Sequence, residues 1–124
     1  MNFKWVTFKV KDLEKSLHFY KELLEIPVAA QFGTPGHQIV MLGDPKGALI
    51  ELIYDPSMTD INPGDGVSIG LEPQDIDALV GKLRDNGFEV SDPMSPNPNL
   101  RFFFVSDPTG YTIQLVESGP GGAF

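Results

Sequence analysis

The sequence predicts an α+β fold made of two βαβββ modules, and three observations lead to this prediction. The chain has 124 residues, a length typical of one domain. A turn followed by an apolar strand, Gly43-Asp-Pro-Lys-Gly-Ala-Leu-Ile-Glu-Leu-Ile53, returns 63 residues later as Ser106-Asp-Pro-Thr-Gly-Tyr-Thr-Ile-Gln-Leu-Val116. Alternating apolar segments and segments with helical spacing follow one another in the same order in each half.

The repeat extends beyond the two turns. At the same offset Val6 aligns with Ile69, and Asp12 aligns with Asp75. One residue is dropped near Ile26, and the offset is restored before the second turn. An internal repeat of this length indicates two copies of one supersecondary unit.

This organisation predicts one domain over residues 1–118. Its two repeats cover residues 3–56 and 66–117. The linker between them, residues 54–66, is rich in Pro, Gly and Asn. Residues 119–124, Gly-Pro-Gly-Gly-Ala-Phe, are expected to form a flexible tail.

The first repeat begins with Trp5–Val10, whose alternation suits a strand with one buried face. Asp12 is placed to cap the helix that follows. That helix carries its apolar residues at helical spacing. The stripe consists of Leu13, Leu17, Tyr20, Leu23 and Leu24. Three further strands are predicted at Val28–Phe32, Gln38–Leu42 and Ala48–Tyr54.

The second repeat has the same pattern. Val67–Leu71 is the first strand, and Asp75 caps a helix that ends at Asn86-Gly87, since Gly adopts a left-handed conformation at low cost. The remaining strands are predicted at Phe88–Val90, Arg101–Val105 and Tyr111–Glu117. Asp92–Asn99 contains three prolines and is predicted to be a loop.

The two Asp-Pro-x-Gly turns have a defined chemistry. Pro presets φ, Gly supplies a positive φ, and the Asp side chain bonds its own backbone. We therefore expect Asp44 and Asp107 to accept backbone N–H groups, and Gly47 and Gly110 to have positive φ.

Composition excludes several classes of protein. The net charge of −8 argues against binding nucleic acid through phosphates. This acidity either makes the surface soluble or favours a cationic ligand by long-range attraction. The absence of cysteine excludes disulfides and thiolate metal sites. No apolar run has the length of a membrane span, and no secretory signal is recognised, so we expect a cytoplasmic protein without a membrane partner.

The chain resembles the vicinal oxygen chelate superfamily, which includes glyoxalase I, extradiol dioxygenases, fosfomycin resistance enzymes and bleomycin-binding proteins. The segments that carry the resemblance are Val6–Tyr20, Ile50-Glu-Leu52, Asp75–Leu79 and Arg101–Gly110. The resemblance implies a pseudo-two-fold axis between the modules, a U-shaped cleft and a homodimer. It does not imply one reaction, because the fold hosts several chemistries and metal-free binders.

In members of the superfamily that use a metal, the first and last strand of each module each supply one ligand. The resemblance places these ligands at Trp5, Glu51, Ser68 and Gln114, and the spacing of 46 residues within each pair agrees with the repeat. Only Glu51 is an ordinary metal ligand, because an indole N–H is a donor only. We therefore expect neither a metal nor another cofactor.

Strand alternation predicts which side chains face the cleft. Val6, Phe8 and Val10 are expected to face the helix, and their neighbours in the strand face the other way. Of the three consecutive phenylalanines at 102–104, at least one is expected to face the cleft or an interface. The predicted ligand-binding residues are Trp5, Thr7, Leu49, Glu51, Ser68, Phe102, Phe104, Thr112 and Gln114.

Trp5 and the two histidines leave alternatives open. Trp5 either stacks on a ligand or plugs the space that a metal would occupy. His18 is expected on the solvent face of the first helix. His37 is expected in a turn that enters a strand, where it either has a surface role or offers the one route to an unusual metal site.

Glu51 interrupts an apolar strand, and a buried carboxylate must be paired or hydrogen-bonded. It is predicted either to act on a ligand, as a cation partner or general base, or to be satisfied by Gln114, Ser68 or the Trp5 indole. Three functional hypotheses follow. The first is a metal-free protein that binds, and thereby sequesters, a small drug or metabolite. The second is a metal-dependent lyase, isomerase or dioxygenase with an altered site. The third is a metal-free enzyme with Glu51 as its base.

Overall fold

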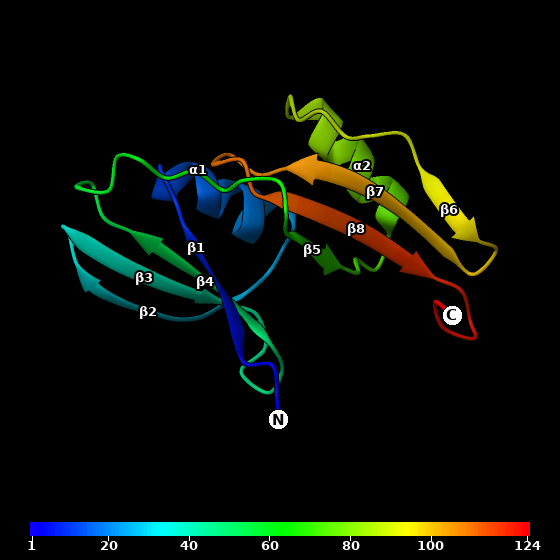
Figure 1. The fold of residues 1–124 in the computed structure, drawn as a ribbon, viewed down its shortest axis with the longest axis horizontal. Coiled ribbons are helices and arrows are strands. Elements are labelled where there is room, and N and C mark those ends of the chain that lie inside the picture. Colours follow the sequence, from blue (N-terminus) through cyan, green and yellow to red (C-terminus); the bar gives the residue numbers. More distant parts are fainter. The chain divides into compact units, whose positions relative to one another are not determined.

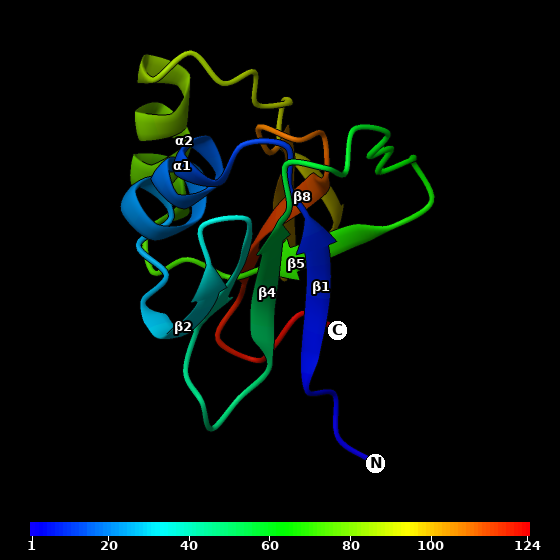
Figure 2. The ribbon, with the colours of Figure 1, turned by 90° about the vertical axis from the view of Figure 1, so that its left-hand side faces the viewer.

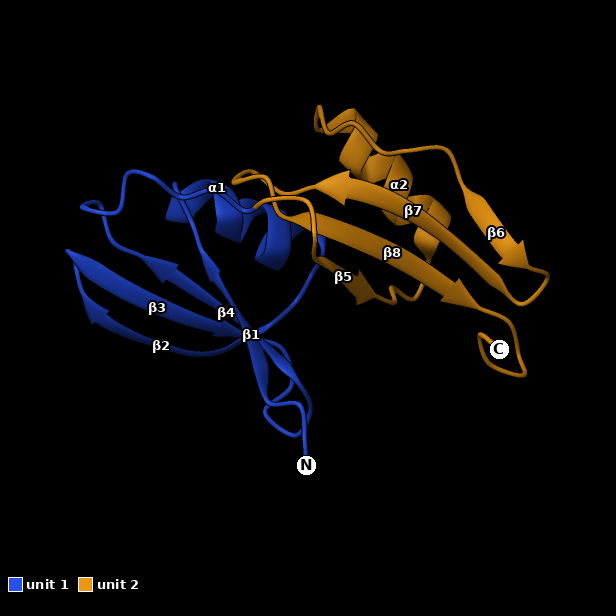
Figure 3. Cartoon of the chain, viewed as in Figure 1, with its two compact units in different colours: residues 1–63 blue, residues 64–124 orange.

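The computed structural model describes all 124 residues and divides the chain into two compact units, residues 1–63 and 64–124 (Figure 3). The division falls within the predicted linker. Each unit contains one helical segment and one four-stranded mixed sheet (Figure 1). The predicted α+β fold of two βαβββ modules is confirmed. The pseudo-two-fold axis and the cleft concern both units together and stay predictions.

The two sheets have the same topology. The first consists of β1 (Trp5–Lys9), β2 (Val28–Thr34), β3 (His37–Leu42) and β4 (Leu49–Tyr54), in the order β1-β4-β3-β2. The second consists of β5 (Ser68–Leu71), β6 (Met94–Asn97), β7 (Leu100–Ser106) and β8 (Thr112–Ser118), in the order β5-β8-β7-β6. The first strand of each unit runs parallel to the last, as β1 does beside β4 in Figure 2.

Strand register is also repeated between the units. Trp5 lies opposite Leu49 in the first sheet, and Ser68 lies opposite Thr112 in the second. Ser68 and Thr112 lie 63 residues after Trp5 and Leu49. The offset of the sequence repeat therefore also relates the paired residues of the two sheets.

One face of each sheet is buried with its helical segment. In the first unit Phe8 and Val10 are buried, and the rings of Phe8 and Tyr20 lie 6.0 Å apart. In the second unit Phe103 and Val105 of β7 are buried, as are the apolar residues of helix α2 (Ile76–Asp85). This confirms the predicted alternation, and it leaves the opposite face of each sheet for a site.

The first helix differs from the prediction. Asp12 caps it as expected, accepting the Lys15 N–H at 3.0 Å, but the α-helix α1 spans only Leu13–Leu17 and continues as a π-helix, η1, over His18–Leu23. The wider turn changes which residues face inward. The buried side chains of this segment are those of Ser16, Phe19, Tyr20 and Leu23, whereas Leu13, Leu17 and Leu24 of the predicted stripe are partly exposed.

The second helix follows its prediction. Asp75 accepts the Ala78 N–H at 3.1 Å, and the apolar stripe of α2 is buried. Gly87 follows the helix with a φ of 86°. Neither helix has the length and apolar content that a membrane-spanning helix needs.

The predicted strand Phe88–Val90 and the predicted loop Asp92–Asn99 are both wrong. Val90 makes only an isolated bridge to Val105, and strand β6, Met94–Asn97, lies inside the segment predicted to be a loop. Because β6 is an edge strand, it tolerates Pro96, whose missing N–H is not needed on the outer side. Its pairing with β7 is irregular between Met94 and Asn97.

The two Asp-Pro-x-Gly turns differ in detail. The Asp107 carboxylate accepts the backbone N–H groups of Thr109, Gly110 and Tyr111 at 2.8–2.9 Å, and the φ of Gly110 is 113°. In the first turn Asp44 accepts the Lys46 N–H at 2.9 Å. Gly47 does not have a positive φ, which corrects the expectation for that copy.

The end of the chain forms a turn. Gly122 donates to the Gly119 carbonyl at 2.9 Å, Gly119 donates to the Asn99 carbonyl at 2.7 Å, and the Asn97 amide donates to the Ala123 carbonyl at 3.1 Å. The residues expected to form a flexible tail are thus hydrogen-bonded to the turn between β6 and β7.

The helix ends provide a stability test. Glu25 has a φ of 58° at the position where the second unit has Gly87. Since a Cβ is unfavourable there, we expect Glu25→Gly to raise the free energy of unfolding by about 0.5–1 kcal/mol. Chemical denaturation checks this.

Two variants control this prediction. Glu25→Gln keeps the Cβ and should give no comparable gain. Gly87→Ala adds a Cβ that meets no atom within 4 Å, so it should lower stability by about 1 kcal/mol through backbone strain alone. If Glu25→Gly is no more stable than Glu25→Gln, residue 25 does not have the strained positive φ described above.

Candidate functional site

The first sheet presents a hydrogen-bonded carboxylate on the face away from its helix. Thr7 and Glu51 lie opposite each other on β1 and β4, and the Thr7 hydroxyl donates to Glu51 Oε1 at 2.6 Å. Trp5 and Leu49 form the preceding pair of this face, and the Trp5 side chain is 49% exposed. The face therefore combines an aromatic ring, an aliphatic side chain and one oriented carboxylate.

This geometry corrects the expected environment of Glu51. The side chain is only partly buried, and its partner is Thr7, which was expected on this face but not in this role. A carboxylate has about four acceptor positions, and Thr7 occupies one of them. Glu51 can therefore accept a further donor or cationic group.

The second sheet presents an aromatic pair on its corresponding face. The rings of Phe102 and Phe104 lie 5.5 Å apart at 76°, an edge-to-face arrangement, whereas Phe103 is buried on the opposite face. Gln114 of β8 lies opposite Phe104. Two partly exposed rings beside one amide provide an apolar surface with a single polar anchor.

Small and hydroxyl-bearing residues complete this face. Thr112 of β8 lies between Ser68 of β5 and Ser106 of β7. Gly70 lies opposite Gln114, and a Cβ at Gly70 would come within 3.9 Å of Gln114 Oε1. The second face is thus shallow on the β5 side and aromatic on the β7 side.

The structure groups the nine predicted ligand-binding residues by unit. Four lie on the helix-free face of the first sheet: Trp5, Thr7, Leu49 and Glu51. Five lie on the helix-free face of the second sheet: Ser68, Phe102, Phe104, Thr112 and Gln114. Their binding of a ligand stays a prediction.

The donor set does not fit the metal that some members of the resembled superfamily use. No three His, Cys, Asp or Glu side chains form a group that could hold a metal ion. Of the four expected positions, Trp5 has no lone pair to offer and Ser68 is a poor neutral ligand. Catalytic sites usually have about three protein ligands, and only Glu51 is an ordinary one.

The two histidines pair with neighbouring carboxylates. His18, on η1, lies 3.3 Å from Glu22, and His37, at the start of β3, lies 3.8 Å from Asp55. Hydrogen bonds from Ser57 hold the pKa of Asp55 below its ordinary value, with a smaller contribution from His37. Both histidines are about half exposed, as expected for His18.

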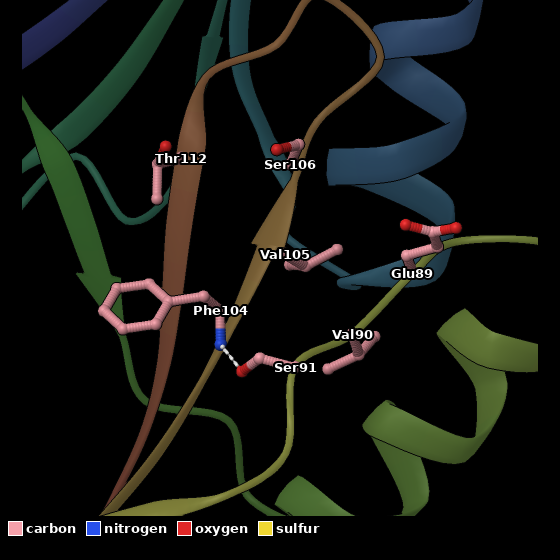
Figure 4. Close-up of a pocket in the computed structure, with 7 residues that line it drawn as sticks. All are labelled: Glu89, Val90, Ser91, Phe104, Val105, Ser106 and Thr112. Atoms are coloured by element: carbon pink, nitrogen blue, oxygen red, sulfur yellow. Dashed lines mark hydrogen bonds between the residues drawn. The ribbon is translucent and has the colours of Figure 1, made fainter. Parts of the chain in front are cut away.

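A hollow of about 310 Å³ lies at the end of β7 in the second unit (Figure 4). It is lined by Glu89, Val90, Ser91, Phe104, Val105, Ser106 and Thr112. Phe104 and Thr112 were predicted for the site, whereas Glu89 and Ser91 were not. Glu89 was interpreted as part of a regular strand and Ser91 was assigned to no element, so no sequence signal placed them at a hollow.

Arg101 joins three elements on the helix side of the second sheet. From β7 it donates to Asp77 of α2 at 2.9 Å and to Glu117 of β8 at 3.1 Å. Its guanidinium also lies 5.6 Å from the centre of the Phe103 ring. These contacts hold α2 against β8 and against β7, the strand that carries Phe102 and Phe104.

Comparison with known families gives one match across most of the chain. Residues 2–115 match the Glyoxalase/Bleomycin resistance protein/Dioxygenase superfamily. The chain belongs to this superfamily. The family resemblance expected from the sequence is confirmed.

Several relatives are named lactoylglutathione lyases. A probable lactoylglutathione lyase of Synechocystis sp. is 29% identical over 119 residues, which cover 89% of this chain and 90% of that protein. A lactoylglutathione lyase of Arabidopsis thaliana is 27% identical over 128 residues, which cover 95% of this chain and 44% of that protein. The chain thus spans less than half the length of this plant relative.

Solved structures share the fold. An antibiotic binding protein of Streptomyces sp., TnmS3, is 26% identical with a TM-score of 0.71, covering 96% of this chain and 97% of that chain. Glyoxalase I of Leishmania major is 25% identical with a TM-score of 0.79, covering 94% and 86%. Glyoxalase I of Zea mays has a TM-score of 0.83 at 18% identity, covering 95% and 45%, and shows the fold alone.

The Arg101 contacts predict a pH effect. The hydrogen bond from Arg101 lowers the pKa of Asp77 below 3.8, so the pair stabilises the fold above that pH and loses its contribution as the pH falls through the folded-state pKa. We expect the pKa of Asp77 to rise toward its ordinary value in Arg101→Gln. A carboxyl NMR titration measures it.

Glu117→Gln is the matched control, because it removes the second partner and leaves the Arg101–Asp77 hydrogen bond. The pKa of Asp77 should stay low in this variant. If the pKa of Asp77 is the same in Arg101→Gln as in the unchanged protein, the hydrogen bond from Arg101 is not the cause of its low value.

Proposed function

We propose that the chain binds a small organic molecule reversibly, without a metal, and so sequesters a drug or metabolite. The observation that carries this proposal is the partly exposed Phe102–Phe104 pair, which lies beside the Gln114 amide on a sheet face free of helix. An aromatic surface with few polar anchors suits a ligand with a flat apolar body.

The first sheet, which belongs to the other unit, presents anchors of its own. Trp5 offers a partly exposed ring, and Glu51 offers acceptor positions beyond the one that Thr7 occupies. A ligand donor that reaches Glu51 would form a charge-assisted hydrogen bond, which is stronger than a neutral one. In this proposal Glu51 orients the ligand and transfers no proton.

The comparisons support this class of function. TnmS3 is named as an antibiotic binding protein, and its likeness to this chain spans nearly the whole of both. The ligand of this chain is proposed by chemistry only. A cytoplasmic location and a homodimer are part of the same proposal.

Two enzymatic functions are the alternatives. The first, a metal-dependent lyase, isomerase or dioxygenase, is favoured by relatives named lactoylglutathione lyase and opposed by the donor set. The second, metal-free proton transfer by Glu51, is favoured by the carboxylate that Thr7 orients.

Binding is tested by isothermal titration calorimetry in a screen of aromatic compounds, and quenching of Trp5, the only tryptophan, reports separately on the first sheet. We expect saturable binding without product formation. Phe104→Ala should weaken the binding of a hit about tenfold, since stacking on an aromatic side chain contributes roughly 1–1.5 kcal/mol. Phe124→Ala, at the exposed chain end, is the matched control and should leave affinity unchanged. Equal affinities in both variants would refute the proposed face.

The metal content of the protein distinguishes the proposed function from the metal-dependent enzyme. The chain is incubated with nickel, zinc, manganese and ferrous iron, then dialysed and assayed. We expect no stoichiometric metal, because one carboxylate does not make a tight site. A retained metal that is lost in Glu51→Gln would favour the metal-dependent enzyme. Turnover that is lost in Glu51→Gln while ligand binding persists would favour the proton-transfer enzyme.

A further inference from the structure

The hollow at the end of β7 connects two kinds of surface. Figure 4 shows the Phe104 ring and Thr112 on one side of β7, and Glu89 and Val90 on the other, with Ser106 at the end of the strand between them. The residues that line the hollow thus include Phe104 and Thr112 of the proposed binding face and one carboxylate, that of Glu89. This carboxylate lies outside the proposed binding face.

The wall that carries Glu89 is anchored by hydrogen bonds. Ser91 donates its backbone N–H to the Phe104 carbonyl at 2.9 Å, and its Oγ accepts the Phe104 N–H at 2.8 Å. Arg84 Nη2 donates to the carbonyls of Val90 and Ser91 at 3.2 Å each. Residues 89–91 therefore have a defined position, and Glu89 projects from a fixed backbone.

Charge at the hollow has one sign. Glu89 is the only ionisable side chain among the lining residues, and it is exposed. Residues 64–124 contain nine Asp and Glu but three Lys and Arg. Of the three cations, Arg101 is paired with two carboxylates, and Arg84 is bound to the carbonyls behind the wall. The field at the hollow therefore favours a positive group.

The rest of the lining suits an ammonium group on an apolar arm. Val90 and Val105 provide apolar contact beside Glu89, and the Ser106 and Thr112 hydroxyls are available as acceptors along the strand end. A carboxylate ligand would meet Glu89 and be repelled. A neutral ligand would use the valines and the hydroxyls alone.

We propose that the hollow binds a protonated amine, carried on an arm of the ligand whose apolar body rests on the Phe104 side, with Glu89 as the ion-pair partner. This inference rests on the proposed function, because the body of the ligand uses the same face. It adds a substrate class, organic ammonium compounds, and a residue that selects for it.

Three probes with one body and different head groups test the inference: 4-phenylbutylamine, 4-phenylbutanol and 4-phenylbutyrate. Each is titrated into the full chain at low salt, and the backbone amides of residues 89–91 and 104–106 are followed by NMR. We expect the amine to bind about tenfold more tightly than the carboxylate, with a preference that falls as salt is added. Its shifts should include residues 89–91.

Two variants distinguish the effect of the Glu89 carboxylate from the effect of the net negative charge of residues 64–124. Glu89→Gln should weaken amine binding about threefold to fivefold, the size expected for an exposed ion pair, and leave alcohol binding unchanged. Asp85→Asn removes the same charge from α2 at a residue outside the hollow, and should leave both affinities unchanged.

The outcomes distinguish this inference from the proposed function. Equal binding of the three probes, equal losses in Glu89→Gln and Asp85→Asn, or no shifts at residues 89–91 would overturn the amine site. Any of these results leaves the proposed function standing if Phe104→Leu still weakens the alcohol. If the affinities of all three probes are unchanged in Phe104→Leu, the proposed binding face is wrong, whichever head group binds most tightly.

Discussion

Parallel pairing of the first and last strand in each unit is the constraint on which the proposed site depends. Trp5 opposite Leu49 and Ser68 opposite Thr112 set the register of the two sheets. Side chains alternate between faces, so this register decides which residues pack with the helix and which do not. A shift of one residue in β1 would bury Thr7 and expose Phe8. The large apolar residues buried with each helix prevent such a shift.

The same register position has diverged between the two repeats. In the first sheet it holds Thr7 opposite Glu51, a hydrogen-bonded pair with a formal charge. In the second it holds Gly70 opposite Gln114, so that the amide has no side chain opposite it. One sheet therefore offers an oriented anion, and the other a neutral anchor next to two aromatic rings.

Membership of the superfamily does not determine which reaction, if any, the chain catalyses. The side chains at the positions of the metal ligands reduce the range of reactions. The relatives include proteins named as lyases and a structure named as an antibiotic binder. At the positions where metal-using members place ligands, this chain has a tryptophan, a serine and a glutamine besides Glu51. The fold is shared, while the chemistry depends on a few side chains that differ between members.

Much of the fold could be predicted because the strand and helix patterns of the first repeat occur again in the second. Asp12 and Asp75 cap their helices as predicted, and Phe103 and Phe104 face opposite sides of β7. Sequence reasoning failed where neighbouring segments compete for the same edge. Beside β7, part of the predicted loop, including Pro96, forms β6, and Ser91 substitutes a side-chain hydrogen bond for regular pairing. No local pattern distinguishes these outcomes, because edge pairing depends on the strand already present.

The sequence by itself determined the two modules, the helix caps, the faces of the strands and the donor types at Trp5, Glu51, Ser68 and Gln114. These properties follow from spacing and residue chemistry, which are local. Only the tertiary structure decided that Thr7 satisfies Glu51, that η1 replaces the end of the first helix, and that Glu89 lines a hollow with Phe104. Each of these depends on distances between segments far apart in the chain or on packing against a sheet, which residue spacing alone does not specify.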